Sequence, residues 1–261
     1  MKKHLSHWCL ALALAALPAL ARAADRHFIY TEESTVQDAG EKDLETYTTY
    51  RFGRDAFYSA MDQSLEFEVG LGGSAQFASY LNFTQEFAAA LPGGEPGLNT
   101  EGPVLDGVST ELKLKLADNV ADPLGVGLYF EPEFEPDELD LETKLILDKK
   151  MGSWLVAFNL TAEPGFDYTD MGTSLLLRPS LGVGYFLTSR WFIGLEAMNE
   201  NFYDDAPMRS VLSAGPELEY AGDSWWVAVA FLPQLANIGS STLDFTDSQR
   251  DQVRLATSFS L

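Results

Sequence analysis

The sequence predicts an all-β protein, specifically a closed antiparallel up-and-down transmembrane β-barrel of about 12 strands. About twelve segments alternate apolar and polar residues with a period of two, the spacing of a strand whose two faces differ. The connections between these segments alternate between short and long. Aromatic residues gather beside the short connections. Together these three observations are typical of a barrel with one short-turn end and one long-loop end.

The first element is an export signal in residues 1–23. Lys2 and Lys3 precede an apolar run from Cys9 to Leu20, and the small-residue pattern Ala-Arg-Ala ends at Ala23. A transmembrane helix needs roughly 20 apolar residues, so this run is too short to span a bilayer. We therefore expect a signal peptide that is cleaved after residue 23.

Cleavage would leave a strongly acidic chain without cysteine. The full sequence has 17 basic and 39 acidic residues. Removal of the three basic residues in 1–23 leaves 14 against 39, a net charge of −25. Nucleic acid is therefore not an expected partner, and no disulfide can form. The acidity fits a solvated surface, attraction of cations, or carboxylates that line a cavity.

Residues 24–42 are polar without a sustained period, and we expect them to form an N-terminal periplasmic extension. His27 lies in this extension and is expected to be exposed. The barrel is expected to occupy residues 43–261. Its predicted strands are residues 43–52, 62–71, 74–86, 106–117, 124–134, 137–148, 151–163, 173–187, 190–202, 209–221, 223–236 and 250–261.

The connections differ between the two expected ends of the barrel. Those after the second, fourth, sixth, eighth and tenth strands are short, whereas residues 87–105, 164–172, 203–208 and 237–249 form longer ones. Short periplasmic turns and longer outer loops are the usual arrangement in outer-membrane barrels.

The two faces of the predicted strands have opposite character. One face carries apolar residues such as Leu181, Val183, Ile193 and Leu195, and the other carries most of the charges. A soluble β-sandwich could show the same alternation, with its charged faces in water. In a barrel the charged face lines the lumen, and the candidate lumen and selectivity residues are Glu66, Glu68, Glu111, Glu131, Glu133, Glu138, Asp140, Glu142, Glu217, Glu219, Arg51, Lys113, Arg178 and Arg254.

The aromatic residues favour the barrel over the sandwich. Four tryptophans, including Trp226, follow short turns within a few residues. Indole and phenol rings are enriched at membrane interfaces, which explains a ring of them at one height. The expected membrane-interface girdle consists of Trp154, Tyr185, Trp191, Tyr220 and Trp225.

With these features the chain resembles the outer-membrane β-barrels of Gram-negative bacteria over residues 43–261. Its last strand, QVRLATSFSL, keeps most of the apolar alternation of the C-terminal signal, although Leu261 replaces the usual terminal aromatic residue. The resemblance implies a location in the cell outer membrane. It also implies two partners, outer-membrane lipid and the barrel assembly machinery.

No enzymatic chemistry is expected. Several enzymes of this superfamily are built around a histidine, and His27 is the one histidine after residue 23. A serine with a lysine, or a carboxylate pair, leaves a lipid-active enzyme as the least favoured alternative. The acidic run from Glu131 to Glu142 could offer oxygens to calcium, but it lacks EF-hand spacing. We therefore expect no catalytic residue, no metal and no cofactor.

The function hypothesis follows from the size and charge of the lumen. Eight strands leave room for side chains and sixteen leave a water channel, so about twelve strands predict a narrow or partly obstructed passage. Unpaired carboxylates require water around them. We expect a narrow channel for small polar solutes that prefers cations. The alternative is a non-conducting barrel with a structural role or a role in binding a ligand or partner.

Overall fold

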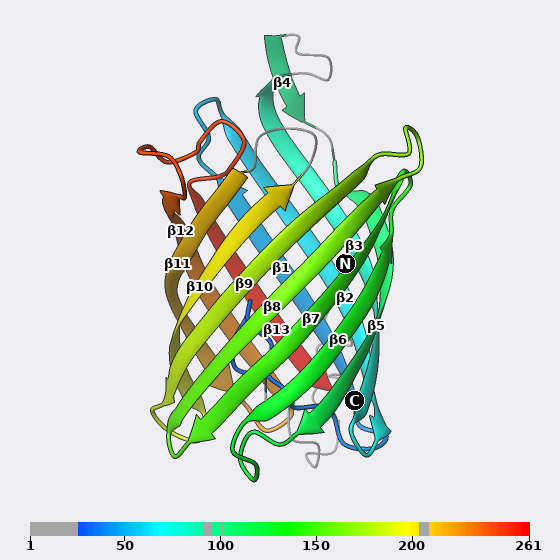
Figure 1. Ribbon diagram of the computed structural model, residues 1–261, viewed down its shortest axis with the longest axis vertical. Coiled ribbons are helices and arrows are strands. Elements are labelled where there is room, and N and C mark those ends of the chain that lie inside the picture. Colours follow the sequence, from blue (N-terminus) through cyan, green and yellow to red (C-terminus); the bar gives the residue numbers. More distant parts are fainter. Residues whose placement is uncertain (1–25, 91–95, 101, 204–208) are drawn as a thin grey trace, which may run out of the picture.

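The computed structural model describes residues 26–90, 96–100, 102–203 and 209–261, and the predicted signal peptide lies outside them. These residues form a closed antiparallel β-barrel (Figure 1). The strands are β1 (Lys42–Phe52), β2 (Tyr58–Gly72), β3 (Ala75–Ala90), β4 (Pro96–Thr100), β5 (Val104–Ala117), β6 (Gly125–Phe134), β7 (Glu138–Met151), β8 (Trp154–Asp167), β9 (Thr173–Phe186), β10 (Trp191–Tyr203), β11 (Arg209–Ala221), β12 (Trp225–Asn237) and β13 (Asp251–Ser260).

Twelve of the described strands, all except β4, close the barrel. Neighbours in the chain pair with each other, β3 pairs with β5, and β1 pairs with β13 along a register from Asp43 opposite Ser260 to Phe52 opposite Asp251. Closure leaves no unpaired sheet edge around the ring. The predicted fold class and its twelve strands are confirmed.

Strand β4 was not predicted. It pairs with the end of β3, where Phe87 lies opposite Thr100, and this hairpin projects past the barrel rim (Figure 1). Both parts were expected to lie in a connection, residues 87–105. The run Phe-Ala-Ala-Ala at the end of β3 lacks the alternation of polar and apolar residues that predicts a strand. Strand β8 likewise continues into the expected loop 164–172, as far as Asp167.

The end opposite this hairpin has tight turns. Gly152 adopts a positive φ of 63° between Met151 and Trp154, the last facing pair of β7 and β8. A residue with a β-carbon is disfavoured in this conformation, so glycine permits the shortest connection.

Apolar side chains cover the outside of the barrel. Leu114, Leu128, Leu145 and Leu160 face one another in register across β5 to β8, and three of the four are exposed. A row of leucines across four strands, three of them exposed, is unfavourable in water and suits a lipid environment. None of the described residues forms a helix that is long and apolar enough to cross a membrane.

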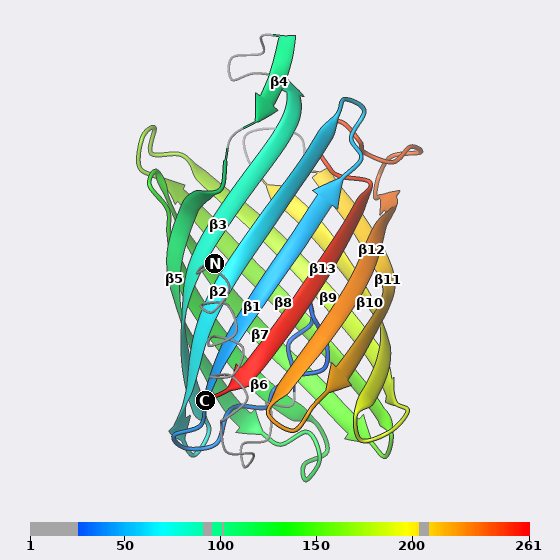
Figure 2. The same cartoon turned by 180° about the vertical axis from the view of Figure 1, so that it is seen from behind.

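The N-terminal segment lies inside the barrel. Figure 2 shows its dark-blue trace behind β12 and β13, within the ring of strands. Thr31, Glu32, Glu33 and Ser34 are all buried. The segment joins β1 at the short-turn end of the barrel. There Gly40 and Glu41 form backbone hydrogen bonds with Gly70, near the end of β2. An extension outside the barrel was expected, and for residues 26–37 the structure shows a lumen location instead.

Candidate functional site

Residues 26–37, termed here the lumen segment, are anchored to the barrel wall at two places. Phe28 is buried against Leu155, Ala157 and Phe192 of β8 and β10. The next residue, Ile29, is buried in a second apolar cluster further around the wall. The other members of that cluster come from β1, β12 and β13, and they are Tyr47, Trp226, Ala228, Ala230, Leu232 and Ala256. Two consecutive side chains therefore anchor the segment to two separate parts of the barrel wall.

Glu196 of β10 fixes the backbone of the lumen segment. Its carboxylate accepts hydrogen bonds from the backbone N–H groups of Ile29 at 3.1 Å, Tyr30 at 2.9 Å and Thr31 at 2.7 Å. Hydrogen bonds to a charged group contribute about 1.5–3 kcal/mol each. A single buried carboxylate thus satisfies three donors of a segment that has no strand partner.

Glu32 connects the segment to the barrel wall through ion pairs. Its carboxylate lies 2.9 Å from Arg26 within the segment and 3.0 Å from Lys113 of β5. Lys144 of β7 is 3.8 Å away. The backbone of Glu32 also exchanges two hydrogen bonds with the amide of Asn159, at 2.6 and 2.9 Å. Lys113, a predicted lumen residue, therefore holds the segment.

His27 is enclosed rather than exposed as expected. Its Nδ1 lies 2.8 Å from Oε2 of Glu219, and its ring contacts Phe186 and Phe192. Glu217 accepts a hydrogen bond of 3.3 Å from the backbone of Ile29. The predicted lumen residues Glu217 and Glu219 therefore face the lumen segment.

Glycines in the barrel wall make room for the segment. A β-carbon on Gly182 would lie 2.8 Å from the Phe28 ring, and one on Gly70 would lie 2.0 Å from the carbonyl oxygen of Asp38. Inward-facing alanines such as Ala228 and Ala230 serve the same purpose on β12. Small or apolar residues on the charged face are the sequence signal that could have located the segment inside.

A cavity of about 600 Å³ lies between the lumen segment and the long-loop end. Its floor includes Arg26, Tyr30 and Glu32, and its upper wall includes residues 247–249 of the β12–β13 connection. The structure brings seven of the predicted lumen residues to this cavity: Arg51, Glu66, Glu131, Glu133, Glu142, Arg178 and Arg254.

A second cavity of about 270 Å³ lies on the short-turn side of the segment. The predicted lumen residues in its lining are Glu66, Glu68, Glu111 and Lys113. Arg26, Glu32 and Glu66 line both cavities, so these residues separate the two spaces.

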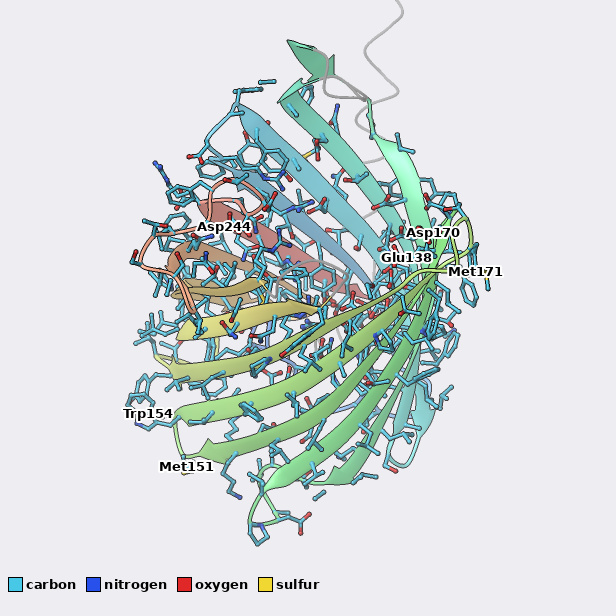
Figure 3. All side chains as sticks on the ribbon, turned by 45° about the horizontal axis from the view of Figure 1, so that its top comes forward. Glu138, Met151, Trp154, Asp170, Met171 and Asp244 are labelled. Carbon is cyan, nitrogen blue, oxygen red and sulfur yellow. The ribbon has the colours of Figure 1, made fainter. Side chains whose placement is uncertain are left out.

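The acidic run from Glu131 to Glu142 is divided by its position along the barrel. Glu131, Glu133 and Glu142 line the large cavity, but Glu138 and Asp140 do not. Glu138 lies at the rim, near the tip of the β8–β9 loop (Figure 3). Among the described residues, no group of three or more acidic, histidine or cysteine side chains is arranged to hold a metal ion.

Several charges in the large cavity are neutralised locally. Arg178 binds Glu142 at 2.5 Å and Glu163 at 3.2 Å. Lys144 lies 2.6 Å from the other oxygen of Glu142. Arg51 donates two hydrogen bonds to Asp62, at 2.6 and 2.7 Å. These pairs position side chains on the wall without adding net charge to it.

The charged residues of the cavity that were not among the sequence candidates include Arg54, Asp106, Glu135 and Arg209. Arg54 and Glu135 follow the ends of strands, where the period-two pattern no longer predicts whether a side chain points into the lumen or outward. Burial, together with the nearby carboxylates of Asp106 and Glu133, raises the pKa of Glu135 to about 7. Its charge therefore changes near neutral pH.

The predicted girdle residues lie at the short-turn end of β8 to β12. Trp154 contacts Tyr185, with ring centroids 5.0 Å apart. Tyr220 contacts both Trp191 and Trp225, at 4.8 and 5.5 Å. Figure 3 shows Trp154 on the outside at this end.

Trp226, the fourth tryptophan, is different. It is only 2% exposed and packs against Ile29, because alternation turns it inward when Trp225 faces outward. It therefore does not belong to a ring on the outside.

Comparisons with known proteins agree with this fold. The structure of the NanC porin is similar, with a TM-score of 0.57 and 12% identity over 84% of this chain and 100% of that chain. The β domain of the Bordetella autotransporter BrkA gives a TM-score of 0.52 and 12% identity over 86% of this chain and 100% of that chain. Both are outer-membrane-type barrels, and at this identity the likeness concerns the fold alone.

The sequence places the chain in a family. No curated protein matches it. A sequence model described as "Family of unknown function (DUF6662)" matches residues 20–261, which include the lumen segment and every strand of the barrel. The chain therefore belongs to the DUF6662 family.

Proposed function

We propose that this protein is an outer-membrane channel for small polar solutes, with a preference for cations, whose lumen is narrowed by its own N-terminal segment. The membrane location is supported by the exposed leucine rows and by the aromatic contacts at the short-turn end. The likeness to the NanC porin is consistent with this location.

The observation that carries the proposal is the large polar cavity inside an apolar-coated barrel. A cavity of about 600 Å³ has room for a hydrated ion or a small solute. The second cavity, of about 270 Å³, continues toward the short-turn end. A solute would pass between them beside Arg26, Glu32 and Glu66.

The cation preference is supported by carboxylates that lack a basic partner. Glu133 is held by the amide of Asn82 at 2.5 Å, and Glu131 accepts hydrogen bonds from the hydroxyls of Ser109 and Tyr129. Neutral donors orient these groups and add no positive charge beside them. Acidic groups in a narrow passage attract cations more strongly than they do in bulk water.

Planar-bilayer recording of the purified full-length mature protein tests the proposal. We expect small single-channel currents and a cation-selective reversal potential in a salt gradient. The double variant Glu131→Gln/Glu133→Gln should still conduct, with its reversal potential moved toward anions. Glu138→Gln, at the rim outside the cavity, is the matched control and should change the potential less.

The alternative is a barrel that does not conduct and instead binds a ligand or partner. The observation that favours it is the lumen segment, whose contacts reach two separate parts of the barrel wall. Absence of current from wild-type protein that is shown to be folded would support this alternative and contradict the channel.

A further inference from the structure

The large cavity has walls of opposite charge. Asp106, Glu131, Glu133 and Glu135 lie on β5, on β6 and just after β6. Arg54, Arg209 and Arg254 lie just after β1, on β11 and on β13. Counted around the closed sheet from β1, β5 and β6 take the fourth and fifth of twelve places, and β11 and β13 the tenth and twelfth. Arg209 and Arg254 therefore lie across the lumen from the acidic groups, whereas Arg54, at the first place, lies three places from β5.

The basic wall is held in place by aromatic rings rather than by carboxylates. The guanidinium of Arg54 lies 3.6 Å from the centroid of Tyr58, and that of Arg209 lies 4.0 Å from the centroid of Phe202. Arg254 lies 4.2 Å from the Tyr30 ring and donates a 2.7 Å hydrogen bond to Thr49. Within the part of the chain that the structure describes, these three arginines form no ion pair. Stacking fixes the position of each cation and leaves its charge available.

The acidic wall is built in a comparable way. Glu131 and Glu133 are oriented by hydroxyl and amide donors, and no lysine or arginine among the described residues pairs with either. By contrast, Glu142, Glu163 and Asp62 of the same cavity are all paired with basic residues. Glu66 on β2 and Asp247 on the β12–β13 connection also line the cavity without an ion pair among the described residues, so the unpaired acids are concentrated on β5 and β6 but are not confined there.

From this arrangement we infer that the large cavity is a binding site for small zwitterions, solutes that carry an ammonium group and a carboxylate on one short chain. The ammonium group would meet the acidic wall, and the carboxylate would meet the arginines, whose planar groups suit a carboxylate. A solute with one charge gains from one wall and is repelled by the other. This inference rests on the proposed function in that it names the solute class of the same lumen.

The test compares three probes with the same four-carbon chain: 4-aminobutyrate, butylammonium and butyrate. Each is titrated into the full-length mature protein, folded in detergent at low salt, and binding is followed by broadening of the probe's NMR signals. A charge-assisted hydrogen bond is equivalent to about a ten-fold change in affinity. We therefore expect 4-aminobutyrate to bind about ten-fold more tightly than either singly charged probe.

Variants of each wall test which charged group of the solute that wall binds. Arg54→Gln/Arg209→Gln should weaken 4-aminobutyrate binding about ten-fold without weakening that of butylammonium. Glu133→Gln/Glu135→Gln should weaken 4-aminobutyrate without weakening butyrate. Arg54→Lys/Arg209→Lys keeps the charge and should retain part of the affinity. Arg190→Gln and Asp223→Asn alter an exposed 2.7 Å ion pair at the short-turn end and are the matched controls.

The outcomes separate this inference from the channel. If butylammonium or butyrate binds wild-type protein as tightly as 4-aminobutyrate, or if none of the probes binds, the zwitterion site is wrong even where the protein conducts. If 4-aminobutyrate binds selectively but bilayers show no current, the channel is wrong and the site stands. The comparison of probes on wild-type protein does not depend on the folding of any variant.

Discussion

At the scale of single residues, Glu135 links the charge of the cavity mouth to pH. Its pKa of about 7 results from burial and from the acidic groups that face it, namely Asp106, Glu133, Asp140 and Glu138. A raised carboxyl pKa means that the group is protonated below that pH and negative above it. The mouth therefore gains a negative charge as the pH rises through neutrality.

This predicts that cation selectivity increases between pH 6 and pH 8. Reversal potentials measured across that range should shift toward cations for the wild type and shift less for Glu135→Gln. Asp170→Asn, in the loop between β8 and β9 outside the cavity, should behave like the wild type. A wild-type reversal potential that is constant across this pH range would contradict the prediction.

Glu196 is a second residue with a large expected effect. Its carboxylate accepts three backbone hydrogen bonds from the lumen segment, whereas the amide of Glu196→Gln has a single acceptor oxygen. The variant should lose about 1–3 kcal/mol of interaction with the segment. We expect larger and noisier single-channel currents, while Ile193→Val, on the exposed outer face of the same strand, should leave the current amplitude near that of the wild type.

At the scale of elements, the lumen segment is a removable obstruction. It is held through Phe28 and Ile29 at two parts of the barrel wall and makes no strand pairing of its own among the described residues. The barrel strands pair independently of it, so the barrel should still close when the segment is loosened.

The double variant Phe28→Ala/Ile29→Ala tests this role. Truncation of a buried large side chain costs about 2–5 kcal/mol. Here the loss should mainly weaken the binding of the lumen segment to the barrel wall. Single-channel conductance should rise several-fold. Thr35→Ala, at a half-buried position of the same segment, should have little effect, and equal conductance of all three proteins would show that the segment does not limit flow.

A further prediction concerns the stability cost of a charge on the outer face of the strands. Leu160 lies in the leucine row of β5 to β8, six residues along β8 from Trp154. Arginine on a lipid-facing strand costs about 2–4 kcal/mol near the bilayer midplane and less toward the interface. Unfolding in lipid vesicles should therefore show a larger loss of stability for Leu160→Arg than for Ile193→Arg, which lies two residues from Trp191. Equal stability of both variants and the wild type would contradict the assignment of this face to lipid.

At the scale of the whole molecule, closure of the sheet should make the barrel resistant to detergent. Every strand of the ring pairs on both sides, so no edge is available where unpairing could begin. Unboiled protein should migrate differently from boiled protein on a gel with dodecyl sulfate. Identical mobility, together with recovery in the soluble fraction of cells, would contradict a membrane barrel.

The barrel, its twelve ring strands and its apolar outer face could be predicted from the sequence, because period-two alternation is a local property of each strand. It also indicated that Glu131, Glu133 and Arg254 face inward. It did not reveal that residues 26–37 fill the lumen, since that segment has no period and depends on contacts with residues more than a hundred positions away, such as Glu196 and Trp226. Only closure of the sheet decided which charges meet. Closure paired Arg178 with Glu142 and Glu163, and it placed Arg209 and Arg254 across the lumen from Glu131 and Glu133. The reason is that the distance between two side chains in a barrel depends on their strands' places around the ring and not on their separation in sequence.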